Sequence, residues 1–274
     1  MKKALLAVFV LALLAGAVAL IYFDPLYRGP EKETPPVVEE QPPQEEKAPP
    51  VRYAVEEPLP PAAPSFSEEA APPPPQERPE TFQEGLAALF GQKTLRDLFH
   101  LDHFIERFVV TVDNVLASQV PRKFLPLQAP KGRFLVSGGE GDEIVSPYNY
   151  RRYAPYVRIA EALDAEKAVA LYVRFYPRFQ KAYREMGYTS GHFNDRLTEV
   201  LDHLLATPEV EEPIRLVRPR VLHEYADPEL EALSGGQKAL IRTGSENAAA
   251  LKAKLRQIRA ELLERTASSR IRRD

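Results

Sequence analysis

The sequence predicts a mainly α-helical domain with one small β-hairpin, preceded by one transmembrane helix and a disordered proline-rich tether. Three observations predict this architecture. Residues 4–23 contain no charged side chain, residues 24–80 hold 17 of the 27 prolines, and apolar residues beyond the tether recur mostly at helical spacing. We therefore expect a single helical domain over 81–266 and a basic, frayed tail over 267–274.

The first predicted element is a membrane helix over residues 4–23. Its 20 residues would span about 30 Å, the thickness of the hydrocarbon core of a bilayer. Lys2 and Lys3 precede it and an acidic stretch follows, so the positive-inside rule places residues 1–3 in the cytoplasm and the rest outside. The alternative is a signal peptide that is cleaved after Ala19, which the continuing apolar run disfavours.

Residues 24–80 are expected to form a tether without a packed core. Besides its prolines, this stretch carries 13 acidic and 5 basic side chains. Such a composition favours extended polyproline II structure over a folded unit. Its 57 residues would reach about 175 Å at full extension. We interpret the tether as a spacer; a ligand for proline-recognition modules is the alternative.

The folded part is predicted to consist of helices joined by loops. Asp164 is expected to cap one helix and Gly187 to end it, while Thr94 and Ser245 are expected to cap two others. Glycines between two short apolar runs predict the hairpin. In chain order we expect two helices in 82–116, an irregular loop at 118–133, the hairpin at 134–145, helices at 147–163, 165–187 and 191–206, an extended or irregular stretch at 209–226, a short helix at 228–233 and a last helix at 245–266.

An apolar stripe runs along the last predicted helix at alternating steps of three and four residues. We expect this stripe to pack on its own domain, because it is too short to predict a coiled coil. A homodimer formed through the C-terminal helix is the alternative. The stripe consists of Ala248, Leu251, Leu255, Ile258 and Leu262.

One motif matches the signature of ABC-type ATPases. It consists of Leu233, Ser234, Gly235, Gly236 and Gln237. The signature acts together with a P-loop on a partner subunit, and the nearest glycine pair, Gly85 and Gly91, lies one residue too far apart for a P-loop. We therefore expect no ATP binding, and we interpret the motif as a helix end followed by a glycine turn.

The helix predicted at 191–206 carries its imidazoles and carboxylates within one arc of its surface. Two imidazoles and two carboxylates on one face are typical ligands of zinc or a harder metal. The four residues extend over about 16 Å of helix, so one ion could contact only an adjacent subset. The ordinary polar face of an amphipathic helix is the favoured alternative. The candidates are His192, Asp195, Glu199 and His203.

Tyrosines and arginines interleave between residues 148 and 188. Tyrosine suits contacts with proteins and glycans, but most of these rings are expected to pack in the core with their hydroxyls at its edge. The loop at 121–133 is basic and could meet an anionic polymer or lipid, but a solvated loop is the favoured alternative. As binding residues the sequence offers only weak candidates, which are Tyr148, Tyr150, Tyr153, Arg122 and Lys123.

The composition excludes several classes of function. The chain contains no cysteine, which excludes disulfides and thiolate metal sites. The net charge of −3 gives no basic excess of the kind that nucleic-acid binding requires. No motif predicts a cofactor, and no serine nucleophile elbow or paired zinc histidines are present to predict catalysis.

Several segments together carry a family resemblance. They read VPRK at 120–123, SPYNYRRYAPY at 146–156, FNDRL at 193–197, HLLATPE at 203–209 and DPEL at 227–230. In this order the chain resembles the bacterial family named domain of unknown function 3014. The resemblance implies one helical domain behind a membrane segment and a proline-rich stretch, in the inner (cytoplasmic) membrane of a bacterium. It implies no reaction, ligand or catalytic residue.

Location and layout therefore give the functional expectation. We expect a membrane-anchored cell-envelope protein whose domain lies in the periplasm or extracytoplasmic space and acts as a non-enzymatic binding or interaction module. Its partners would be the membrane, through residues 4–23, and an unidentified envelope protein or glycan. The alternative is an envelope enzyme that acts on cell-wall or lipid-linked material, with a metal as an optional component.

Overall fold

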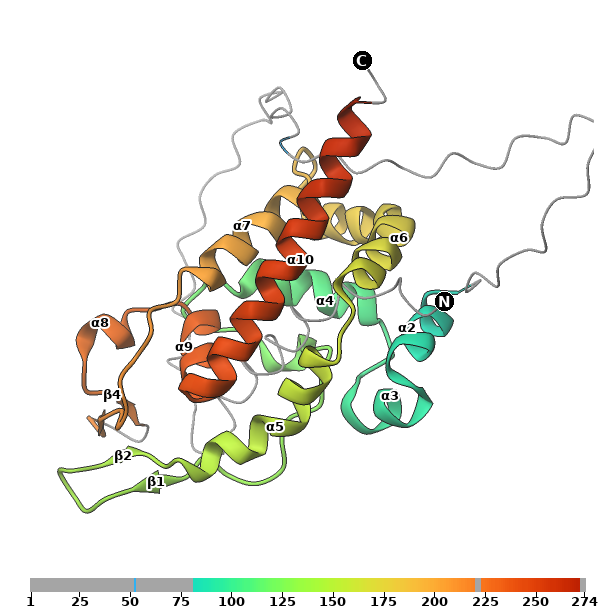
Figure 1. Ribbon diagram of the computed structural model, residues 1–274. Helices are drawn as coiled ribbons and strands as arrows, with labels where there is room; N and C mark the ends of the chain where they lie inside the picture. The colour runs from blue at the N-terminus through green and yellow to red at the C-terminus, as the bar shows by residue number, and fades with distance from the viewer. Residues whose placement is uncertain (1–51, 53–80, 220–222, 272–274) are drawn as a thin grey trace, which may run out of the picture.

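The computed structural model describes Arg52, residues 81–219 and residues 223–271 (Figure 1). The predicted membrane helix and the tether other than Arg52 lie outside these residues. Within the described ranges no helix is both long enough and apolar enough to cross a membrane. The domain itself is mainly helical, as the sequence predicts, and its described residues form two small two-stranded hairpins where the sequence predicts one.

The elements follow one another with short connections. The helices are α2 (Phe82–Phe90), α3 (Gln92–Leu98), α4 (Phe104–Asn114), α5 (Tyr148–Glu161), α6 (Ala165–Glu185), α7 (Phe193–Leu205), α8 (Pro228–Glu231), α9 (Gly235–Arg242) and α10 (Ser245–Ile271), with a 3-10 turn η1 (Arg122–Phe124). The strands are β1 (Val136–Ser137), β2 (Ile144–Val145), β3 (Leu216–Val217) and β4 (Glu224–Tyr225). The three long central helices match their predicted ranges to within a few residues.

Aromatic rings fill the centre of the domain, where α2, α4, α6 and α7 meet. Phe179 of α6 is fully buried and lies 5.6 Å from Phe108, 5.3 Å from Tyr172 and 6.0 Å from Phe193, measured between ring centroids. Most of these pairs are edge-to-face, the arrangement that the ring quadrupole favours. The expectation that tyrosines pack in the core is confirmed for Tyr153, Tyr156, Tyr172, Tyr176 and Tyr183, which are all buried.

The long helix α10 lies across α5, α6 and α7 (Figure 1). Leu251, Leu255, Ile258 and Leu262 are each 3 % exposed or less. The predicted packing of the apolar stripe on its own domain is therefore confirmed, and these side chains are not available to a second copy. The helix also continues to Ile271, into the stretch predicted as a frayed tail, and residues 272–274 lie outside the described residues.

Capping residues set several helix ends. Asp164 accepts from the Lys167 N–H at 3.3 Å and caps α6, as predicted. The prediction that Thr94 is a cap was wrong, because Thr94 lies inside α3. Thr81 instead begins the domain with a capping box, in which its hydroxyl accepts from the Glu84 N–H and the Glu84 carboxylate accepts from the Thr81 N–H.

A second hairpin follows α7, in the stretch expected to be extended or irregular. Strand β3 pairs with β4, and the segment before β3 also pairs with β2 through a 2.9 Å hydrogen bond from the Val145 N–H to the Ile214 carbonyl. The two hairpins thus share a small apolar core with α9. It contains Val145, Ile214, Leu216, Tyr225 and Ile241.

Candidate functional site

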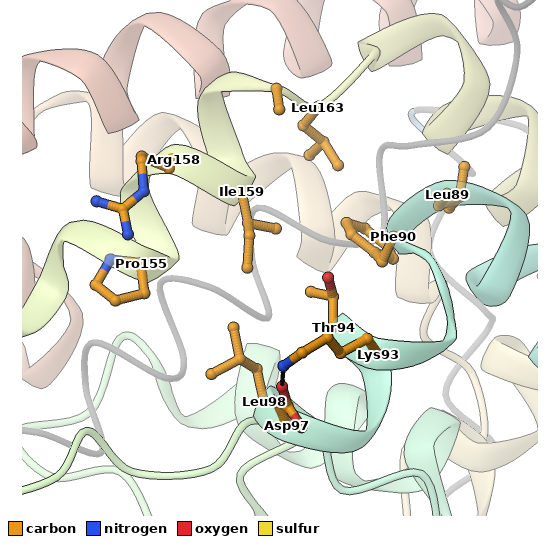
Figure 2. Close-up of a pocket in the computed structure, with 11 residues that line it drawn as sticks. Leu89, Phe90, Lys93, Thr94, Asp97, Leu98, Pro155, Arg158, Ile159 and Leu163 are labelled. Carbon is orange, nitrogen blue, oxygen red and sulfur yellow. Dashed lines mark hydrogen bonds and ion pairs between the residues drawn. The ribbon is translucent and has the colours of Figure 1, made fainter.

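An open groove of about 490 Å³ lies between the α2–α3 pair and α5 (Figure 2). Figure 2 shows Ile159 of α5 and Leu98 of α3 directed into the same space, with Phe90 at its side. All three side chains are half-buried in the free domain. The groove is lined by Leu89, Phe90, Lys93, Thr94, Asp97, Leu98, Pro155, Arg158, Ile159, Ala162 and Leu163.

The two walls of the groove come from separate parts of the fold. The first wall, formed by α2 and α3, is held in place because the Leu95 side chain of α3 is buried in the domain core. Gly91, at a φ of 74°, allows the sharp turn between these two helices. The second wall is fixed because Val157 and Ala160 of α5 are buried on the opposite face of that helix. The apolar space is therefore formed by helices whose other faces are already packed.

Charged groups border the apolar floor. Lys93 forms an ion pair with Asp97 one turn along α3, and this hydrogen bond lowers the pKa of the Asp97 carboxyl. Arg158 is exposed on α5. Among the described residues no ion pair includes Arg158. The rim thus offers a guanidinium to a carboxylate of a bound molecule.

The histidines and carboxylates predicted on α7 do not form a metal centre in the described ranges. There, no group of three or more His, Cys, Asp or Glu side chains lies close enough to hold an ion. Glu199 pairs with Arg196 at 2.9 Å, and His203 Nε2 lies 2.8 Å from the Ser234 hydroxyl. Partial burial of His203 lowers its imidazole pKa. His192 precedes α7 without a side-chain cap bond.

Metal binding by this face stays a prediction of the sequence, and the geometry gives an expected result for its test. Addition of zinc or manganese to the purified protein should leave its melting temperature unchanged, because no three potential ligands among the described residues lie close enough together to hold an ion. The His203→Gln variant should behave in the same way. A metal-dependent increase in melting temperature that Asp195→Ala abolishes would contradict this expectation.

An ion-paired cluster joins α4 to α7, and sequence reasoning missed it. Arg196 Nε donates to Asp113 Oδ1 at 3.0 Å, and a terminal guanidinium nitrogen donates to the Asp113 carbonyl at 2.8 Å. The Tyr188 hydroxyl donates to the other Asp113 oxygen at 3.0 Å, and its ring stacks on Tyr183. No local pattern could have identified this cluster, because Asp113 lies 75 positions before Tyr188 and 83 positions before Arg196.

The weak binding candidates from the sequence are scattered over the surface and the core. Tyr148 is 64 % exposed and Tyr150 is half-buried, but Tyr153 is 1 % exposed. Tyr153 was therefore a wrong candidate, because its ring belongs to the core beneath α10. Arg122 and Lys123 are exposed on η1, and the Lys123 ammonium lies 4.7 Å from the centroid of Phe124. None of these residues lines the groove.

The ATPase-like motif is a helix start in this fold. Its interpretation as a helix end followed by a glycine turn was wrong, because Ser234 caps α9 and Gln237 completes the capping box. The Gly235 and Gly236 N–H groups donate to the carbonyls of Ala117 and Val115 at 2.7 and 3.1 Å. The two glycines therefore join α9 to the segment after α4, and Ser234 and Gln237 join it to His203 of α7.

The fold and the groove together define a helical domain with an open groove that is lined mostly by apolar side chains. A family described as "Protein of unknown function (DUF3014)" matches residues 104–259. Since this match covers more than half of the chain, the protein belongs to that family, as the resemblance predicts. Comparisons with curated proteins and with solved structures each found no match.

Proposed function

We propose that the protein is a non-enzymatic binding module of the bacterial cell envelope. Residues 4–23 would anchor it in the inner membrane, the proline-rich tether would set its reach, and the domain would bind an apolar segment of another envelope protein. The observation that carries the proposal is the open groove between α3 and α5, where apolar side chains stay half-buried in the free domain.

The lining of the groove specifies the chemistry of the occupant. Leu98 and Ile159 would gain burial when an apolar side chain enters between them, which is favourable by about 25 cal/mol per Å². Glycan sites stack sugars on exposed aromatic rings. Phe90 is the aromatic side chain that lines the groove, and it is half-buried, so the groove does not match a glycan site. We therefore favour a protein segment with two apolar side chains and an acidic residue that reaches Arg158.

Site-specific crosslinking in cells tests this proposal. A photo-crosslinking amino acid placed at residue 162, an exposed alanine in the groove, should give a discrete adduct with one envelope protein. The same amino acid at residue 260, an exposed alanine on α10, is the matched control and should give none. The proposal fails if residue 162 gives no adduct, or if both positions capture the same proteins.

The orientation is tested independently with spheroplasts, whose outer surface is open to protease. The domain should be cleaved by added protease while the inner membrane stays intact. The reason is that Lys2 and Lys3, before the predicted membrane helix, place the N-terminus in the cytoplasm and the domain outside it. A cytoplasmic protein serves as the control for intact membranes. A domain that resists protease until detergent is added would reverse the proposed topology.

A further inference from the structure

A basic surface with two exposed apolar side chains lies where the segment before β1 runs along the start of α5. Leu135 is 43 % exposed and Tyr148 is 64 % exposed, and they are two of the four large apolar side chains that the described residues expose. Cationic residues flank both of them. This surface, which we call the basic patch, consists of Lys131, Arg133, Leu135, Tyr148, Arg151 and Arg152. We propose that the basic patch docks on the anionic phospholipid surface of a bilayer.

Hydrogen bonds hold the two segments of the basic patch together. The Asn149 side chain is fully buried, accepts from the Leu135 N–H at 2.9 Å and donates to the Leu135 carbonyl at 2.7 Å. The Arg152 guanidinium donates to the carbonyls of Lys131 and Gly132 at 3.2 and 2.7 Å. The segment and the helix therefore present their exposed side chains as one preformed surface.

The side chains of the basic patch project away from the core. Phe134 and Val136 are half-buried and pack against the small core that the two hairpins share with α9. Side chains alternate in direction along the segment that enters β1, so the exposed Arg133 and Leu135 face away from that core. The patch members on α5 share an arc of about 100° of the helix surface. The apolar and basic side chains are therefore available together to an external surface.

The positive charge of the basic patch is available to an external anion. In the part of the chain that the structure describes, no ion pair includes its four cationic residues, which are Lys131, Arg133, Arg151 and Arg152. The hairpin of β1 and β2 projects from the start of α5 and carries its turn away from that helix (Figure 1). In this turn Asp142 pairs with Arg215 instead, at 3.3 Å. A surface that is cationic and partly apolar is complementary to anionic lipid headgroups above an apolar phase.

The combination of side chains favours a bilayer over a soluble polyanion. Lysine and arginine are attracted to anionic headgroups, and tyrosine is enriched at the interface of a bilayer. The Arg151 guanidinium lies 5.7 Å from the centroid of the Tyr148 ring, so the charge can meet a phosphate while the ring enters the interface. A polyanion would neutralise the cations but leave Leu135 in water. If residues 4–23 anchor the chain as proposed above, a bilayer also lies within reach of the domain.

Tryptophan fluorescence tests the docking, because the chain has no tryptophan of its own. Tyr148→Trp keeps an interfacial aromatic ring and places a single reporter in the basic patch. The full-length protein is reconstituted in phosphatidylcholine vesicles with or without phosphatidylglycerol, which is anionic. Quenching by brominated acyl chains gives the ratio of docked to free domain. We expect docking only in the anionic vesicles, and a decrease as salt is raised.

The charge of the patch is tested in this reporter protein by removing two cations. Arg133→Gln combined with Arg151→Gln should lower the ratio of docked to free domain about thirtyfold, since each cation near an anionic surface contributes about fivefold. The matched control is Arg174→Gln combined with Arg178→Gln, which removes the same charge from two exposed positions on α6 and should leave the ratio unchanged.

The apolar part of the patch is tested with Leu135→Ser, which should also lower the ratio. Val217→Ser is its control, because Val217 of β3 is similarly exposed but lies outside the patch, and it should have no effect. No patch residue lines the groove between α3 and α5, and the vesicles contain no second protein, so the result is independent of what the groove binds. The proposal is overturned if quenching is equal in the two kinds of vesicle, if the two arginine pairs give the same ratio, or if Leu135→Ser behaves as Val217→Ser does.

Discussion

Truncation of Phe179 to alanine is expected to cause the largest loss of stability in the domain, about 3–5 kcal/mol. The ring is fully buried and contacts rings from α2, α4, α6 and α7. Removal would leave a cavity that these helices cannot close, because each is also fixed by α10 or by its own buried residues. Urea denaturation followed by circular dichroism measures the free energy of unfolding.

The conservative variant Phe179→Leu separates lost volume from a general disturbance of α6. Leucine keeps most of the apolar volume, so we expect it to cost less than about 1.5 kcal/mol. A loss below about 1 kcal/mol for Phe179→Ala would show that this ring is not central to the core. Equal losses for the two variants would show that ring geometry matters more than volume.

Gly236→Ala is expected to cost about 2 kcal/mol, although alanine usually stabilises a helix relative to glycine. A β-carbon here would lie 2.5 Å from Val115 Cγ1, 3.0 Å from Leu204 Cδ2 and 3.1 Å from the Val115 carbonyl oxygen. Valine has little rotamer freedom, so α9 would have to move away from the end of α4. That movement would stretch the hydrogen bond from the Gly236 N–H to Val115.

Gly139→Ala is the matched control, because nothing lies within 4 Å of the β-carbon it would add. Its free energy of unfolding should change by less than about 0.5 kcal/mol. If Gly236→Ala is as stable as this control, the close approach of α9 to α4 does not explain the glycines of the motif. Binding of ATP by wild-type protein would contradict the structural interpretation more directly.

Periodicity was sufficient to predict the elements that bury one continuous apolar face. Helices α5, α6, α7 and α10 each carry such a face, and Asp164 signals the start of α6 through its local cap. These features are local, so they can be read from one segment at a time. The same reasoning correctly assigned the α10 stripe to the domain core.

The errors occurred where contacts distant in sequence decide the structure. Two glycines at the start of α9 resemble a turn, but they are needed because the helix lies against Val115 and Ala117. Prolines around β3 left residues 209–226 as extended or irregular, and the hairpin there was not predicted because β3 gains its register from β2 and β4. The groove was not predicted because α3 and α5 form it jointly and neither shows it alone.

The central claim is that the α3–α5 groove binds an envelope protein, and charge reversal at its rim tests this most directly. The measurement is the yield of the residue 162 crosslink in cells that express wild-type protein, Arg158→Glu or Arg178→Glu. Both arginines are exposed, but Arg178 lies on α6 and does not line the groove. We expect Arg158→Glu to lower the yield about tenfold, because an interfacial charge pair becomes repulsive, and Arg178→Glu to leave it unchanged. Equal yields from all three proteins would contradict the account.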